Sequence, residues 1–198
     1  MDELTPALAQ KIAMRDRLLT ARRRLSLLDL QEAAQAIAGH LLATPEVRRA
    51  ATVAAYVSVG TEPGTGPLLE ALLDAGRRVL LPVVLPDLDL DWAVHTGTLR
   101  SAGRGLLEPV GPTLGPEAVA TADVVLTPGL AVDRSGMRLG RGGGSYDRAL
   151  GRVPVGTFTC TLLHEGELVD FVPAEPHDRP VAAAVTPSGV TPFASSPG

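Results

Sequence analysis

The sequence contains a single cysteine, Cys160, among its 198 residues. One cysteine excludes an internal disulfide and a cysteine-based zinc site. Cys160 lies in a run rich in Thr and Phe that has the pattern of a strand. We therefore expect it to be buried in the core and structural rather than a reactive thiol.

Aromatic residues are also scarce, with three Phe, two Tyr and one Trp. The core must therefore be built from Val, Leu and Ala, and an aromatic platform for stacking nucleic-acid bases is not expected. The formal net charge of −4 gives no general attraction to nucleic acid or to an anionic membrane. Any anionic ligand must therefore be held by local cations.

Long apolar runs are absent, since none approaches the ~20 residues that a bilayer span needs. The first residues, Met1 to Leu4, are acidic where a secretory signal would be basic, so we expect a cytoplasmic protein without a membrane partner. Hydrophobic residues make up 45% and charged residues 20%, which is typical of a globular chain. The length fits one core, and we expect residues 1–198 to form a single domain.

The hydrophobic pattern predicts helices first and alternating elements afterwards. Helical spacing predicts two N-terminal helices within residues 6–44, from Pro6 to about Leu28 and from about Asp29 to Leu42, with Ser26 or Asp29 as the cap between them. The rest alternates strands with helices, which predicts an α/β fold, a Rossmann-like three-layer sandwich around a mainly parallel sheet. The predicted strands are 51–58, 78–84, 123–127, 153–162 and 181–186, with a helix at 67–75.

Two stretches break this alternation. Residues 86–116 are rich in Asp, Gly and Pro, and we expect an edge hairpin and a long loop there. From about residue 187 the chain is turn-forming, and we expect a mobile tail.

The stretch from Leu126 to Leu150 carries the strongest chemical signal. A predicted strand ends, a turn forms at 133–136, and a glycine-rich loop leads into a helix that begins near Ser145. Ligands of α/β sheets bind at such strand ends. Glycines without Cβ atoms let the backbone approach a ligand and point several N–H groups at one oxyanion, and the helix dipole adds to this. The glycines concerned are Gly140, Gly142, Gly143 and Gly144.

Arg138 and Arg141 flank this loop and supply guanidinium groups suited to phosphate oxygens, which together with the loop predicts a polyphosphate site. The sequence matches neither a Walker A loop, which ends in Gly-Lys-Ser/Thr, nor GxGxxG, because Ser145 stands where the third glycine would be. The alternative is a mobile glycine hairpin with solvated arginines.

Other candidates are weaker when each is taken alone. Asp147, just inside the helix, could hold magnesium through its carboxylate, but could also be an ordinary acid of the first turn. The pair His177-Asp178 lies in a Pro-bounded turn that could be a surface loop. Lys11 and Arg15, one helical turn apart, could be a solvated basic stripe, although Lys11 is the only lysine in the chain.

Taken together, these motifs resemble the 5-formyltetrahydrofolate cyclo-ligase family, also called 5,10-methenyltetrahydrofolate synthetase. The order and spacing match over almost the whole chain, and the stretch from Arg138 to Asp147 (RLGRGGGSYD) is close to the family's most specific motif. The matching motifs are Lys11-xxx-Arg15, Glu62, Glu108-Pro109, Pro128-Gly129, Arg138 to Asp147, and His177-Asp178.

The resemblance implies a fold like that of the sugar-phosphate isomerases and CoA transferases, and a role for each motif. It assigns Val57, Glu62 and the run Arg141, Gly142, Gly143, Gly144 and Ser145 to the folate pocket, and Asp147 with Asp178 to magnesium. Two positions depart from many members, which have lysine at Gly143 and an aromatic residue at Ser145. The residues implied in ATP binding are Lys11, Arg15, Arg138, Leu139, Gly140, Arg141, Gly142, Gly143, Gly144, Ser145 and Tyr146.

The implied activity is ATP- and Mg²⁺-dependent cyclisation of 5-formyltetrahydrofolate, with or without a polyglutamate tail, by a monomer. The formyl oxygen attacks the γ-phosphate of ATP, N10 closes the ring, and ADP and phosphate are released, with Arg141 as the catalytic residue. One alternative is a sugar-phosphate isomerase or CoA transferase, which needs no ATP. Another is a non-catalytic relative that binds ATP and folate, and a purely structural role is disfavoured by the Gly/Arg loop.

Overall fold

The computed structural model describes residues 5–194, and a seven-stranded sheet forms its centre. The strand order is β12-β11-β9-β6-β1-β2-β3, in which the inner strands run parallel and the two edge strands, β3 and β12, run antiparallel to their neighbours. The predicted α/β class with a mainly parallel sheet is confirmed. The strands are β1 (Thr52–Ala54), β2 (Arg78–Val84), β3 (Leu90–Val94), β6 (Val124–Pro128), β9 (Phe158–Leu162), β11 (Ala183–Thr186) and β12 (Gly189–Pro192).

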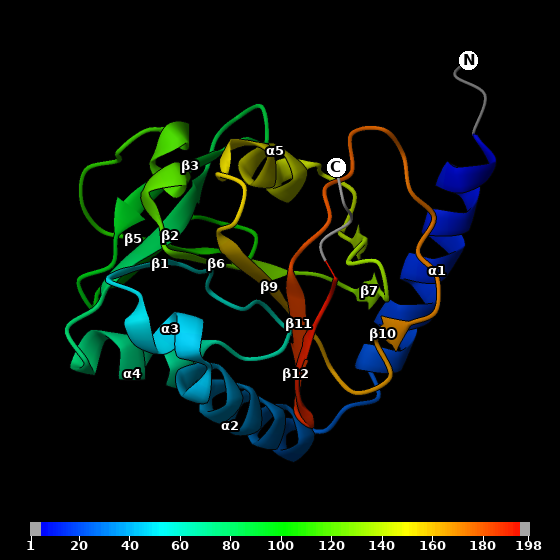
Figure 1. The fold of residues 1–198 in the computed structure, drawn as a ribbon, viewed down its shortest axis with the longest axis horizontal. Helices are drawn as coiled ribbons and strands as arrows, with labels where there is room; N and C mark the ends of the chain where they lie inside the picture. Colours follow the sequence, from blue (N-terminus) through cyan, green and yellow to red (C-terminus); the bar gives the residue numbers. More distant parts are fainter. Residues whose placement is uncertain (1–4, 195–198) are drawn as a thin grey trace.

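Helices cover both faces of this sheet (Figure 1). On one face lie α2 (Leu27–Ala43), α3 (Pro45–Arg49) and α4 (Gly66–Asp74). On the other face lie α5 (Ser145–Arg152) and the 3₁₀ helix η1 (Pro116–Thr121). The sheet is therefore the middle of three layers.

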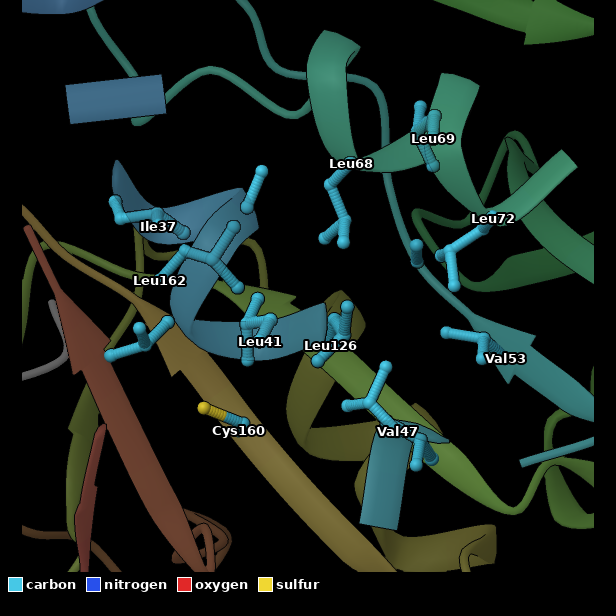
Figure 2. Packing of buried hydrophobic residues seen from close by; sticks show 14 of the residues in the cluster. Ile37, Leu41, Val47, Val53, Leu68, Leu69, Leu72, Leu126, Cys160 and Leu162 are labelled. Atoms are coloured by element: carbon cyan, nitrogen blue, oxygen red, sulfur yellow. The ribbon is translucent and has the colours of Figure 1, made fainter. Parts of the chain in front are cut away.

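The core under α2 and α4 is made of aliphatic side chains, as the scarcity of aromatics predicts. Figure 2 shows Ile37 and Leu41 of α2 beside the strand residues Leu162 and Leu126, all of them at most 1% exposed. Burying one such side chain stabilises the fold by about 1.5–3 kcal/mol. Cys160 is fully buried in this cluster, and burial raises the pKa of its thiol, so the prediction that it lies in the core is confirmed.

Beside the main sheet stands a smaller unit that brings α1 to the site. The helix α1 (Pro6–Arg22) packs Leu18 in one cluster with Leu139 of a three-stranded sheet, whose order is β10-β7-β8, and with Val172 of the loop after β10. Residues 86–116 contribute the antiparallel edge strand β3 and a separate hairpin of β4 and β5. The remaining strands are β4 (Leu99–Ser101), β5 (Leu107–Pro109), β7 (Ala131–Asp133), β8 (Arg138–Leu139) and β10 (Leu168–Val169).

The boundary between the first two helices differs from the prediction. The first helix ends at Arg22 rather than near Leu28, and α2 begins at Leu27. Ser26 and Asp29 act together as a capping box, because the Ser26 hydroxyl accepts a hydrogen bond from the Asp29 N–H and the Asp29 carboxylate accepts one from the Ser26 N–H. Two satisfied backbone donors fix the start of α2 at this point.

The predicted turn-forming, mobile tail from about residue 187 is wrong for residues 189–192, which form β12. This strand pairs antiparallel with β11 in the register Thr186↔Gly189 and Ala183↔Pro192. An exposed strand edge offers unpaired N–H and C=O groups, and a tight turn lets the following residues satisfy them. Residues 195–198, also assigned to the tail, lie outside the described part. Within residues 5–194 we find no helix with the length and apolar character of a membrane span.

Candidate functional site

A cavity of about 680 Å³ lies where β1, β2 and β6 end, with α1 and the glycine-rich loop on its sides. The carboxyl ends of parallel strands are where α/β sheets bind ligands. Every site residue predicted from the sequence lines this cavity. They are Lys11, Arg15, Val57, Glu62, Arg138, Leu139, Gly140, Arg141, Gly142, Gly143, Gly144, Ser145, Tyr146, Asp147 and Asp178.

The glycine-rich loop has a backbone that glycine accommodates best. Gly142 and Gly144 have φ values of +105° and +69°, in the left-handed region that other residues avoid. The Arg15 Nε donates a hydrogen bond to the carbonyl oxygen of Gly140 at 2.8 Å. Arg15 of α1 is thereby tied to the loop, and its guanidinium lies next to Gly142.

Arg138 lies beneath the loop and is buried. Its Nη1 donates to the Pro128 carbonyl at 3.0 Å, its Nη2 lies 3.3 Å from an Asp147 oxygen, and its guanidinium carbon lies 5.8 Å from the centre of the Tyr146 ring. Burial lowers the pKa of Arg138, and the Asp147 carboxylate opposes this. The Arg138 Nε has no hydrogen-bond partner among residues 5–194. A buried donor without a partner costs about 1–3 kcal/mol, so an acceptor from a ligand would stabilise it.

An acidic group on the lining of the cavity contacts α1 directly. The Lys11 Nζ lies 2.8 Å from a Glu175 oxygen and also bonds Asp178, while the His177 Nε2 lies 3.6 Å from the other Asp178 oxygen. Burial raises the pKa of Asp178, but hydrogen bonds from Lys11 and from the Glu175 N–H outweigh it and leave that pKa below its usual range. Asp178 therefore carries its charge at neutral pH.

Ligand atoms of Glu175, His177 and Asp178 lie within 4.8 Å of one another, an arrangement whose carboxylate oxygens suit a divalent cation. The two predicted metal ligands are not equivalent in this respect. Asp178 belongs to the group, whereas Asp147 contacts Arg138 and accepts a hydrogen bond from the Arg179 N–H at 3.1 Å. Sequence reasoning missed Glu175, although its spacing of three residues from Asp178 was a usable signal.

Glu62 lies in the loop between β1 and α4, at the boundary of the polar and apolar parts of the cavity. One carboxylate oxygen accepts a hydrogen bond from the Val59 N–H at 2.8 Å, and the other lies 3.3 Å from the Arg141 Nε. Burial raises the pKa of Glu62, opposed by the Val59 hydrogen bond and by the Arg141 charge. The residue predicted for folate and the arginine predicted for ATP are therefore paired with each other in this structure.

The remaining wall is apolar and was not predicted as part of the site. It comes from the end of β2 and from the 86–116 stretch, whose irregular sequence gave no periodic signal. Tyr56, two residues after β1, also lines the cavity, and its hydroxyl has no hydrogen-bond partner among the described residues. The apolar side chains of this wall are Pro82, Val84, Leu90, Leu106 and Leu107.

Comparison with known proteins agrees with this site. The sequence profile of the 5-formyltetrahydrofolate cyclo-ligase family matches residues 7–187. The chain belongs to this family. Both the predicted family and the predicted enzyme class, a folate cyclo-ligase, are confirmed.

Individual family members cover most of the chain. A 5-formyltetrahydrofolate cyclo-ligase of Mycolicibacterium smegmatis is 49% identical over 142 residues, which are 69% of this chain and 73% of the relative. The Escherichia coli K12 cyclo-ligase is 36% identical over 180 residues, which are 85% of this chain and 96% of the relative. The solved structure of Aquifex aeolicus 5,10-methenyltetrahydrofolate synthetase superposes with a TM-score of 0.80 at 27% identity, covering 95% of each chain.

Proposed function

We propose that this protein converts 5-formyltetrahydrofolate to 5,10-methenyltetrahydrofolate, using ATP and magnesium and releasing ADP and phosphate. The observation that supports this best is the division of one cavity into two parts. One part carries the glycine-rich loop, Lys11, Arg15, Arg138 and the acids around Asp178, and the other is apolar with Glu62 at its edge. The first suits a nucleoside triphosphate, and the second suits the faces of a pterin ring whose polar edge meets Glu62.

The polyphosphate would be held by loop N–H groups and by Lys11, Arg15 and Arg141. Backbone amides at a helix start and guanidinium forks are both well suited to phosphate oxygens. Asp178 with Glu175 would hold magnesium, which when bound supplies positive charge next to the phosphates. Phosphoryl transfer depends mainly on positioning and charge stabilisation, and these residues provide both.

Glu62 orients the folate. Its carboxylate can accept two parallel hydrogen bonds from the amino-pyrimidinone edge of the pterin. The formyl oxygen on N5 then attacks the γ-phosphorus, and the bond from that phosphorus to the β–γ bridging oxygen breaks as ADP departs. Coupling to phosphate turns a poor leaving group into a good one. N10 next attacks the formyl carbon and loses its proton, and the C–O bond breaks as phosphate departs. No covalent enzyme intermediate is needed.

The direct test is the absorbance of methenyl-folate formed by the purified protein from 5-formyltetrahydrofolate, ATP and magnesium, with each component omitted in turn. We expect product only when all three are present. Binding of ATP without product would favour a non-catalytic relative, and product without ATP would contradict the proposed mechanism.

Four further expectations stay predictions. They are the monomeric state, the cytoplasmic location, the single domain and the use of polyglutamated folate.

Replacing Glu62 with glutamine is expected to raise KM for the folate, by about 10-fold for the loss of a charge-assisted hydrogen bond, with a smaller change in kcat. Because burial raises the pKa of Glu62, its carboxylate becomes protonated at a higher pH than an exposed glutamate. The wild-type KM should therefore rise as the pH falls, and this rise should be reduced in Glu62→Gln. A KM that is the same in both proteins would remove Glu62 from the folate site.

A further inference from the structure

Glu108 is a carboxylate buried in the otherwise apolar wall of the cavity. It lies in the middle of β5, which packs beside the end of β2, and its side chain is only 11% exposed. Val84, Leu106 and Leu107 line the cavity around it. A charged group in such a setting is costly unless it is hydrogen-bonded, so its partners decide its role.

The partners of Glu108 are weak. One oxygen accepts a hydrogen bond from the Val84 N–H at 3.3 Å, beyond the usual range for N–H···O bonds. The other oxygen lies 3.8 Å from a nitrogen of Arg100, whose side chain is 60% exposed, and such surface pairs contribute little. Within residues 5–194 the structure gives Glu108 no other hydrogen bond or ion pair.

A second buried glutamate, Glu167, has short hydrogen bonds to both of its carboxylate oxygens. Glu167 is even more buried than Glu108, but it receives hydrogen bonds from Arg22 at 2.7 and 2.8 Å and from the His164 N–H at 2.8 Å. Glu108 has one long hydrogen bond and one distant cation in place of three short bonds. It therefore keeps acceptor capacity on the wall of the cavity, where a ligand with N–H donors would use it.

We propose that Glu108 is a second substrate-binding carboxylate, which accepts a hydrogen bond from an amine N–H of the reduced folate. This inference rests on the proposed function. Glu62 is matched to the amino-pyrimidinone edge, and the amines left on 5-formyltetrahydrofolate are N8–H and N10–H. A carboxylate on the apolar side would fix the ring in the plane that brings the formyl group toward the phosphates.

The experiment measures KM for the folate, kcat and the thermal midpoint for Glu108→Ala, Glu108→Gln and the control Arg100→Ala. Loss of a hydrogen bond to a charged group should raise KM about 10-fold or more in Glu108→Ala. Glu108→Gln keeps one acceptor oxygen and should raise KM less. Arg100→Ala removes the distant cation outside the cavity and should leave KM unchanged.

An unchanged KM in Glu108→Ala, whatever its thermal midpoint, overturns the proposal, because a purely structural role at the end of β2 would alter stability alone. If Glu108→Ala does not fold, Glu108→Gln provides the test, and a wild-type KM in that variant overturns the proposal. A wild-type protein that forms no methenyl-folate would instead overturn the proposed function, so the two failures are distinguishable.

Inhibition by folic acid tells the two amines apart, because folic acid keeps N10–H but lacks N8–H. If Glu108 binds N10–H, the Ki of folic acid should rise in Glu108→Ala together with the KM of the substrate. If it binds N8–H, that Ki should stay constant while KM rises, and Glu108 then favours reduced over oxidised folates. A rise in Ki without a rise in KM would contradict both assignments.

Discussion

Replacing Arg141 with alanine is expected to lower kcat about 100-fold or more at saturating ATP and folate, the usual cost of losing one donor to a developing charge. Arg141 lies between Gly140 and Gly142 on the lining of the cavity, and its half-exposed side chain is paired with Glu62 at 3.3 Å. Gly143, where many family members have lysine, supplies no charge. In the proposed mechanism the γ-phosphate therefore depends strongly on the arginines.

The Arg141–Glu62 ion pair predicts which kinetic constant each substitution should change. A pterin bound to Glu62 competes with Arg141 for the same carboxylate and would release the guanidinium to the phosphates. Arg141→Ala should therefore act mainly on kcat, whereas Glu62→Gln should act mainly on the folate KM. Arg134→Ala is the matched control, since Arg134 lies in a surface pair with Asp170. Near-normal turnover of Arg141→Ala at saturation would remove Arg141 from catalysis.

The sequence predicted the site better than it predicted the walls around the site. Arg138 and Arg141 were singled out by their type and spacing around the glycine-rich loop, and Asp178 by the family resemblance, and the structure brings all three to one cavity. Glu175 gains importance only from a long-range contact with Lys11 of α1. Glu108 belongs to a motif that matches the family, but its place in the cavity wall depends on its contact with Val84 of β2. Pairings between distant segments leave no local pattern in one sequence.

The same distinction applies to the fold. The strand 78–84 was predicted with its observed bounds because a continuous apolar run is typical of a buried parallel strand. The tail was wrong because β12 depends on the free edge of β11, not on its own composition. The end of α1 was placed too late, since a capping box competes with the apolar spacing that continues through Leu25.

Replacing Arg22 with alanine is expected to destabilise the fold by about 3–5 kcal/mol, because it leaves a buried carboxylate without its partner. Arg22 is 1% exposed, binds both Glu167 oxygens, and donates to the Gly129 carbonyl at 2.6 Å. The free energy of unfolding in urea measures the effect. Arg134→Ala, in an exposed pair, should change it by no more than about 1 kcal/mol.

The double variant Arg22→Met with Glu167→Met tests the cause. If the unpaired charge is responsible, removing both charges should recover a large part of the lost stability. Equal losses in the single and double variants would instead assign the effect to packing.

The Arg22 pair also bears on function, because it fastens the end of α1 to the backbone that leads from β6 into the site. Lys11 and Arg15 reach the cavity from the same helix. At a temperature where Arg22→Ala remains folded, we therefore expect KM for ATP to rise more than KM for the folate, whose proposed contacts lie on other elements. Equal changes in the two constants would mean that α1 does not position the nucleotide selectively.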